Sequence, residues 1–158
     1  MRQWITFILG FLSFLAVAII VLVLFLGNKP YSETEEQAID RAKSEQLIEQ
    51  VERAYVYTNS AVSVTVLGTN SKGELTAVFV PEGEGKMQTI PLEDKVTAQQ
   101  ARELALAEMD VKEILHTKLG MEGEGPVWEI AFLNEEDSLN YVYLSASDGT
   151  WWKRILNL

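Results

Sequence analysis

The single histidine, His116, is the residue that a catalytic site in this chain would need first. A Ser-His-Asp arrangement requires a histidine as general base. His116 lies in an apolar run that predicts a strand, and the chain has no Gly-x-Ser-x-Gly elbow. A zinc site needs more ligands than one histidine, and no His-Glu-x-x-His motif is present. We therefore expect His116 on the surface or between strands, without a catalytic role.

Acidic residues are the other candidates for chemistry. Two loops, 82–85 and 122–125, share the pattern Glu-Gly-Glu-Gly, and we place them at roughly equivalent positions of an internal repeat. Carboxylates on a flexible loop can bind Ca²⁺, but this spacing is not that of an EF-hand. Glycine turns with solvated glutamates between them explain the same residues. With 23 acidic residues, no pair stands out as a glycosidase site, and the absence of cysteine excludes thiolate chemistry. We predict no catalytic residue, cofactor or metal.

Aromatic residues gather near the carboxyl end, and they suggest a contact surface. Trp151 and Trp152 are neighbours in a predicted strand, so their side chains should point to opposite faces of a sheet. One should lie in the core, and the other should be exposed or covered by a neighbour. An exposed tryptophan on a small sheet would anchor a partner. The candidate partner interface consists of Trp151, Trp152, Tyr141 and Tyr143, although core packing explains most of this set.

The elements that position these residues begin with an uncharged amino-terminal segment, Trp4–Leu26. As a helix this segment would be roughly 35 Å long. That exceeds the hydrocarbon core of a bilayer, which is about 30 Å thick. The run is too long for a cleaved signal peptide, and residues 27–31 offer no Ala-x-Ala-like site. We predict a single retained membrane span, with residues 1–29 forming a short cytoplasmic end and the anchor.

Charge suggests which side of the membrane the remainder occupies. Arg2 favours a cytoplasmic amino terminus, although Lys29 flanks the other end. Without these two residues, the segment 30–158 has 11 Lys+Arg and 23 Asp+Glu, which gives it a net charge of −12. We expect a domain this acidic to be extracytoplasmic, held at the cell membrane by its single span. Its acidity also argues against nucleic acid as a partner, because phosphate binding needs clustered Lys and Arg.

Residues 30–158 contain one pattern twice. Thr34-x-x-Gln37 and Thr97-x-x-Gln100 both match the pattern of a helix capping box, 63 positions apart, and Ser32-x-x-Glu35 is a second candidate for the first helix. Each predicted helix is followed by four segments that predict strands. The first copy consists of a predicted helix over 33–49 and predicted strands over 54–58, 62–67, 75–80 and 86–90. The second copy consists of a predicted helix after Thr97 and predicted strands over 112–119, 127–133, 139–145 and 151–156. The predicted fold class is α+β, with a helix on a small antiparallel sheet in each of two units, 30–91 and 92–158. Each unit alone has a marginal core, so we expect the two to pack together.

Several segments in this order resemble a known family. They are the hairpin Val66–Gly73, the strand end Phe79-Val80-Pro81, Val127-Trp128-Glu129-Ile130 and Leu139-Asn140-Tyr141-Val142-Tyr143. With the amino-terminal span, they make the chain similar to the YpmB/TseB-like proteins of Gram-positive bacteria. The soluble part of those proteins is a tandem of PepSY-like (cystatin-like) domains. The resemblance implies an extracytoplasmic regulator of cell-wall elongation that works with a penicillin-binding protein, and it implies no catalytic residues.

Our functional hypothesis is therefore a membrane-anchored, non-catalytic regulator of cell-wall elongation that binds a penicillin-binding protein or another wall-synthesis membrane protein. We expect no small-molecule substrate. The alternative is a PepSY-type inhibitor or regulator of an extracellular or membrane peptidase, which rests on the fold analogy alone. A peptidoglycan hydrolase is a third reading, for which no constellation of site residues is visible.

Overall fold

The computed structural model describes Trp4, residues 11–21 and residues 32–158. Residues 11–21 are helical and their side chains are exposed. The other residues of the predicted span Trp4–Leu26 lie outside the described residues. Within the described ranges, no helix is both long and apolar enough to cross a membrane.

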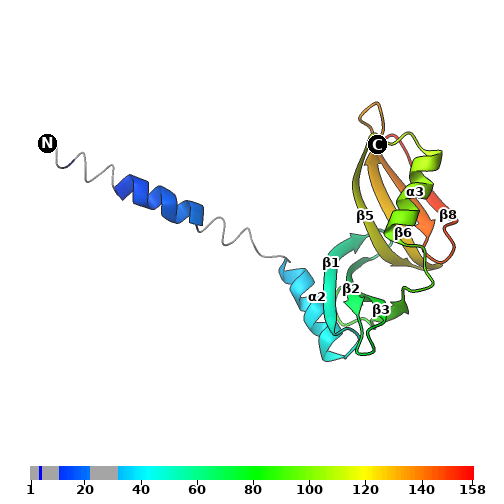
Figure 1. Ribbon diagram of the computed structural model, residues 1–158, viewed down its shortest axis with the longest axis horizontal. Helices are drawn as coiled ribbons and strands as arrows, with labels where there is room; N and C mark the ends of the chain where they lie inside the picture. The colour runs from blue at the N-terminus through cyan, green and yellow to red at the C-terminus, as the bar shows by residue number, and fades with distance from the viewer. Residues whose placement is uncertain (1–3, 5–10, 22–31) are drawn as a thin grey trace. The chain divides into compact units, whose positions relative to one another are not determined.

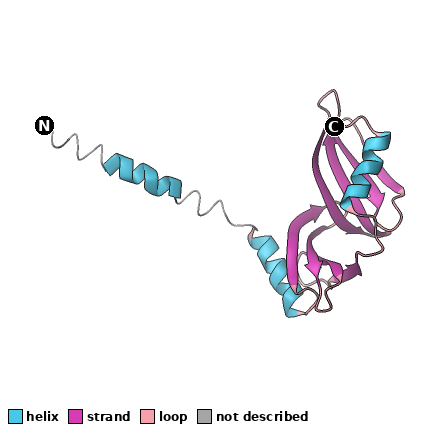
Figure 2. Cartoon of the chain, viewed as in Figure 1, coloured by secondary structure: helices cyan, strands magenta, loops and turns pink. Residues whose placement is uncertain are grey.

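Residues 33–158 form one compact unit, in which two helices each precede a four-stranded antiparallel sheet (Figures 1 and 2). This architecture confirms the predicted α+β class with two antiparallel sheets. The first repeat contains α2 (Glu33–Ser44), β1 (Gln50–Thr58), β2 (Val62–Thr69), β3 (Leu75–Pro81) and β4 (Gln88–Pro91). The second repeat contains α3 (Ala98–Glu108), β5 (Glu113–Glu122), β6 (Gly125–Leu133), β7 (Leu139–Ser145) and β8 (Trp151–Ile155). Strands follow one another in each sheet, and β1 and β5 begin 63 positions apart.

Helix α2 ends at Ser44, before the predicted end at Glu49. Gln46 adopts a positive φ of 58°, and the amide of Leu47 donates to the carbonyl of Ala42 at 3.0 Å. This is a Schellman ending, which terminates a helix through one left-handed residue. Ile48 is then free to pack into the core rather than to continue the helical stripe, and it is 3% exposed.

The two Glu-Gly-Glu-Gly loops are not equivalent, contrary to our prediction. Residues 82–85 connect β3 to β4, whereas residues 122–125 form the turn between β5 and β6. The counterpart of that turn in the first repeat is the β1–β2 connection. The two loops share their composition but not their place in the repeat, because the 63-residue offset does not relate residues 82–85 to residues 122–125.

The main core is shared by both repeats. Ala101 and Ala105 of α3 pack on the β5–β8 sheet, and Ala77 and Phe79 of β3 join the same cluster. The sheet contributes the apolar side chains of one face of its strands: Leu119, Trp128, Ile130, Phe132, Val142 and Leu144. The first repeat thus supplies part of the wall of the second repeat's core, as expected of two units that are each too small alone.

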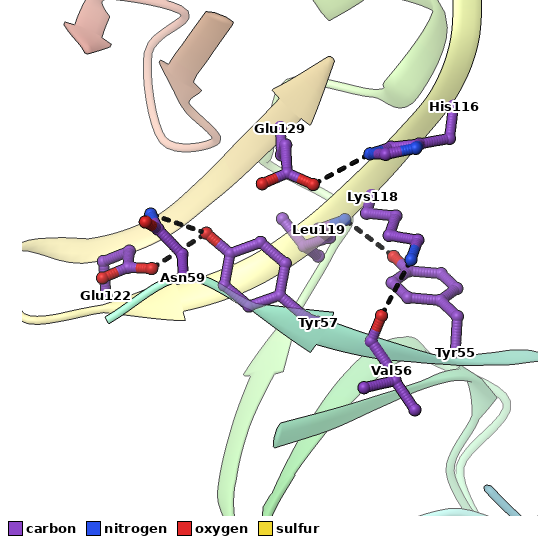
Figure 3. A network of polar contacts seen from close by, with 9 residues as sticks. All are labelled: Tyr55, Val56, Tyr57, Asn59, His116, Lys118, Leu119, Glu122 and Glu129. Carbon is purple, nitrogen blue, oxygen red and sulfur yellow. Dashed lines mark hydrogen bonds and ion pairs between the residues drawn. The ribbon is translucent and has the colours of Figure 1, made fainter. Parts of the chain in front are cut away.

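The junction between the repeats lies where β1 and β5, an edge strand of each sheet, meet. The amide of Leu119 donates to the hydroxyl of Tyr55 at 2.7 Å, and its carbonyl accepts from the hydroxyl of Thr65 at 2.7 Å. In the other direction, Nζ of Lys118 donates to the carbonyl of Val56 at 2.9 Å. Figure 3 shows the contacts of Tyr55, Val56, Lys118 and Leu119. Each repeat therefore satisfies backbone groups that the other leaves open at its sheet edge.

Gly120 gives a direct test of how closely the repeats pack. A Cβ at this position would lie 2.2 Å from the ring of Tyr57, which is 1% exposed and cannot move away without opening the junction. We predict that Gly120→Ala lowers the free energy of unfolding by about 1–3 kcal/mol, the usual cost of overpacking. Urea denaturation of residues 32–158 measures this loss.

Gly123→Ala is the matched control for Gly120→Ala. A Cβ there has no atom within 4 Å, and the position lies just three residues further along the chain. Its urea midpoint should stay close to that of the parent protein. Equal midpoints for the two variants would contradict the close packing of Tyr57 on β5.

Candidate functional site

The candidate functional surface is the face of the β5–β8 sheet that points away from α3. Because side chains alternate along a strand, Trp128 and Ile130 point towards α3, while Val127 and Glu129 point to the opposite side. We call this opposite side the aromatic face. It consists of Tyr57 from β1 together with Val127, Glu129, Tyr141, Tyr143, Trp152 and Ile155. Among the described helices, neither α2 nor α3 contributes to this cluster.

The structure brings three of the four predicted interface residues to this face. Trp152 meets Tyr143 edge-on, with ring centroids 5.8 Å apart, and Tyr141 packs against the same cluster. Tyr143 is only 4% exposed, so Tyr141 and Trp152, both partly buried, are the aromatic residues that a partner could reach. Nζ of Lys153 lies 5.5 Å above the ring of Tyr143.

Trp151 lies on the other side of the sheet, as the alternation of a strand requires. Its indole nitrogen donates to Glu108 of α3 at 2.9 Å, and the guanidinium of Arg154 stacks 3.8 Å above its ring. Arg154 also pairs with the carboxylate of Glu108 at 2.9 Å. Trp151 therefore helps to fix α3 on β8, and it does not share a surface with Trp152.

Two carboxylates at the aromatic face, Glu122 and Glu129, are buried, which the sequence pattern did not predict. Glu122 is 7% exposed and accepts a hydrogen bond from the hydroxyl of Tyr57 at 2.9 Å. Our expectation that this glutamate is solvated is therefore wrong. Glu129 is 6% exposed, and its Oε1 lies 2.9 Å from Nε2 of His116 (Figure 3). The β5–β6 register shifts between Ile114 and His116. His116 thus contacts a side chain of the neighbouring strand, between strands as predicted.

The tyrosines around these carboxylates are held in their neutral form. Burial raises the pKa of Tyr55 to about 12, although its hydrogen bond with the amide of Leu119 acts in the opposite direction. Burial also raises the pKa of Tyr57, with a smaller contribution from Glu122. The pKa of Tyr143 is raised by burial and by the negative charge of Glu129. Neutral hydroxyls can donate to the buried carboxylates, which ionised ones could not.

The loop at 82–85 is held through its backbone rather than through its glutamates. The guanidinium of Arg41 donates to the carbonyls of Pro81 at 3.2 Å, Gly83 at 2.7 Å and Gly85 at 3.2 Å. Glu82 and Glu84 are exposed, as we expected for solvated turn residues. Within the described residues, no group of three or more His, Asp or Glu side chains is arranged to hold a metal ion.

Comparison with known proteins connects this fold with a family. Residues 37–81 match the family described as "Cell wall elongation regulator TseB-like domain". The chain thus resembles the YpmB/TseB-like family, as its sequence indicated. The TseB-like segment extends from α2 to the end of β3, and its match supports a regulatory role in cell-wall elongation.

A solved structure supports the fold over most of the chain. The YpmB protein from Bacillus subtilis superposes with a TM-score of 0.70 at 24% identity, over 80% of this chain and 99% of that one. At this level of identity the likeness concerns the fold. The search of curated proteins found no match.

The sequence of β6 carries a signal for the burial of Glu129. The burial of this strand covers both faces, because Val127, Glu129 and Ala131 are as buried as the apolar residues between them. Val127 and Ala131 are apolar residues on the side that a half-buried strand would leave polar. Apolar residues on both faces of a strand indicate that both faces are covered. The glutamate between them was therefore a candidate for burial.

Tyr57→Phe tests whether the buried carboxylate of Glu122 depends on its tyrosine donor. The change removes one hydroxyl and leaves a buried acceptor without that hydrogen bond, which should cost about 1–3 kcal/mol. Denaturation of residues 32–158 by urea at neutral pH measures the loss. Tyr141→Phe is the control, because the hydroxyl of Tyr141 makes no hydrogen bond within the described residues. A Tyr57→Phe protein as stable as the control would contradict the assignment.

Alkaline pH tests the buried hydroxyl of Tyr55. Its pKa is about 12 in the folded protein against an ordinary value of 10.0, so above pH 10 the unfolded chain loses this proton first. Stability is therefore fully present below pH 10 and falls as the pH rises from 10 towards 12. Urea midpoints at pH 8 and pH 11 should show a smaller alkaline loss for Tyr55→Phe than for the parent protein. An equal loss would place the hydroxyl of Tyr55 in contact with solvent.

Proposed function

We propose that this protein is a membrane-anchored, extracytoplasmic and non-catalytic regulator of cell-wall elongation that acts by binding a penicillin-binding protein. The observation that carries the proposal is the match of residues 37–81 to a cell wall elongation regulator domain. The site itself supports a binding role. Its buried carboxylates are engaged by tyrosine and histidine, and no nucleophile with an adjacent general base accompanies them in the described residues.

The aromatic face provides the surface for such a partner. Trp152 is held edge-on by Tyr143, and Tyr143 in turn packs with Tyr57 across the junction. Tyrosine and tryptophan have few rotatable bonds, so their ordering on binding costs little entropy. A partner that covers Tyr141 and Trp152 would therefore meet side chains that are already in place. Aromatic anchors of this kind carry most of the binding energy at protein interfaces.

The predicted span Trp4–Leu26 completes the proposed mechanism. A single anchor would keep residues 33–158 in the thin layer next to the membrane, where membrane-bound wall synthases also project. Confinement in one layer raises the effective concentration of the two partners, so a modest intrinsic affinity is sufficient.

Covalent crosslinking in the protein's own membranes, followed by purification and identification of the trapped proteins, tests this function. We expect a penicillin-binding protein among those trapped by the parent chain and at least about tenfold less of it with Trp152→Ala, as for an aromatic hot spot. Leu106→Ala is the control, because Leu106 is 51% exposed on α3, on the other side of the sheet.

The outcomes of the crosslinking experiment are distinct. If Trp152→Ala traps as much penicillin-binding protein as the parent chain, the proposed role stands and the aromatic face is rejected as the binding surface. Recovery of a peptidase without any penicillin-binding protein would reject the role and favour the inhibitor alternative.

A further inference from the structure

A cleft between the two repeats has no part in the surface described above. It is an open cleft with a volume of about 310 Å³, which is at the lower end of the range for small-molecule sites. Its walls come from both repeats: Glu52, Arg53, Tyr55 and Leu67 on one side, and Ala98, Thr117 and Trp128 on the other. Two aromatic rings, a hydroxyl and one charge of each sign thus line a single concave site.

A β-bulge places the two charges side by side. Along a regular strand, Glu52 and Arg53 would point to opposite faces of the sheet. The β1–β2 register shifts between Val51 and Arg53, however, so Glu52 is an extra residue without a partner in β2. Bulges redirect side chains in this way and are frequent beside functional sites. As a result, both Glu52 and Arg53 line the cleft.

Arg53 differs from the other arginines of the described chain in having no hydrogen-bond partner. Arg41 donates to three loop carbonyls, Arg102 to the hydroxyl of Thr117 and Arg154 to Glu108. Arg53 donates to nothing among the described residues, and Glu52 beside it accepts nothing there. One free guanidinium and one free carboxylate therefore face the same concave space.

The walls of the cleft are fixed in position while its charges are free. The hydroxyl of Tyr55 is bonded to the amide of Leu119, and Arg102 holds the hydroxyl of Thr117 at 2.9 Å. The indole nitrogen of Trp128 donates to the carbonyl of Val96 at 2.6 Å. A ligand would thus meet a rigid, partly aromatic floor, which lowers the entropic cost of binding.

We propose that this cleft binds a short zwitterionic peptide of about dipeptide size. Its carboxylate would pair with the guanidinium of Arg53, which suits a planar carboxylate through two parallel hydrogen bonds. Its ammonium group would pair with Glu52, and its backbone and side chains would lie against Tyr55 and Trp128. The proposed role is binding alone, and Glu52 acts in it as the partner of the ammonium group. This inference is independent of the proposed function.

The test uses the full chain in detergent micelles, with ¹⁵N-labelled tryptophan and unlabelled alanylalanine as the probe. The four indole signals are assigned by single substitutions, and that of Trp128 reports on the cleft. We expect a saturable shift of the Trp128 signal with a dissociation constant of the order of 1 mM. The signal of Trp152, on the aromatic face, should not move.

Matched variants and matched probes test the role of the charge on Arg53. Arg53→Gln should weaken alanylalanine binding at least about tenfold, as expected for a lost charge-assisted pair. Lys72→Gln, at an exposed turn lysine, should leave binding unchanged. Carboxyl-amidated alanylalanine should bind the parent and Arg53→Gln proteins equally weakly, a result that a merely structural role of Arg53 would not produce.

The proposal fails on any of three results. They are the absence of a saturable Trp128 shift up to about 10 mM probe, equal affinity of the parent and Arg53→Gln proteins for alanylalanine, and equal affinity of the parent for the free and amidated dipeptides. Tetra-alanine, whose terminal charges lie further apart, should bind more weakly than the dipeptide, and tighter binding would contradict the proposed dipeptide size.

Discussion

The mutual capping of two sheet edges is the constraint on which the rest of this structure depends. An edge strand leaves every second residue with an unpaired amide and carbonyl, and such edges tend to recruit other chains. Here the amide and carbonyl of Leu119 on β5 are hydrogen-bonded to the hydroxyls of Tyr55 and Thr65. On β1, the carbonyl of Val56 accepts a hydrogen bond from Lys118. Side chains rather than a continuous ladder join the repeats. Two small sheets therefore become one unit without merging into a single sheet.

The same junction shapes the candidate surface. The ring of Tyr57 in β1 packs against Gly120 of β5, and its hydroxyl donates to the buried carboxylate of Glu122. It thereby becomes part of the cluster that supports Tyr143, and Tyr143 orients Trp152. The first repeat thus determines the packing beneath a surface that belongs to the second. The family match covers residues 37–81 and includes Tyr57 but none of the residues that the second repeat contributes to this surface.

Much of the fold was predictable because local signals agreed. The Thr97 capping box forms as predicted, with the Thr97 hydroxyl accepting from the amide of Gln100, and the strands of both repeats follow the 63-residue offset. The Schellman ending at Gln46 was missed because a glutamine with positive φ carries no sequence signal of the kind that glycine gives. Glu122 was assigned to solvent because its burial depends on Tyr57, which lies 65 positions away. Contacts across such distances are decided by the packing of the repeats, which periodicity within one strand does not reveal.

Hydrogen exchange at the amide of Leu119 tests the central claim most directly. On a free edge strand this amide would point to water and exchange quickly, whereas here it donates to the hydroxyl of Tyr55. If the two repeats form one cooperative unit, the opening free energy at Leu119 should approach the free energy of global unfolding measured under the same conditions. Exchange at the rate of a solvent-exposed loop amide, while the amides of the β6–β7 ladder remain protected, would mean that the repeats separate freely and would contradict the account.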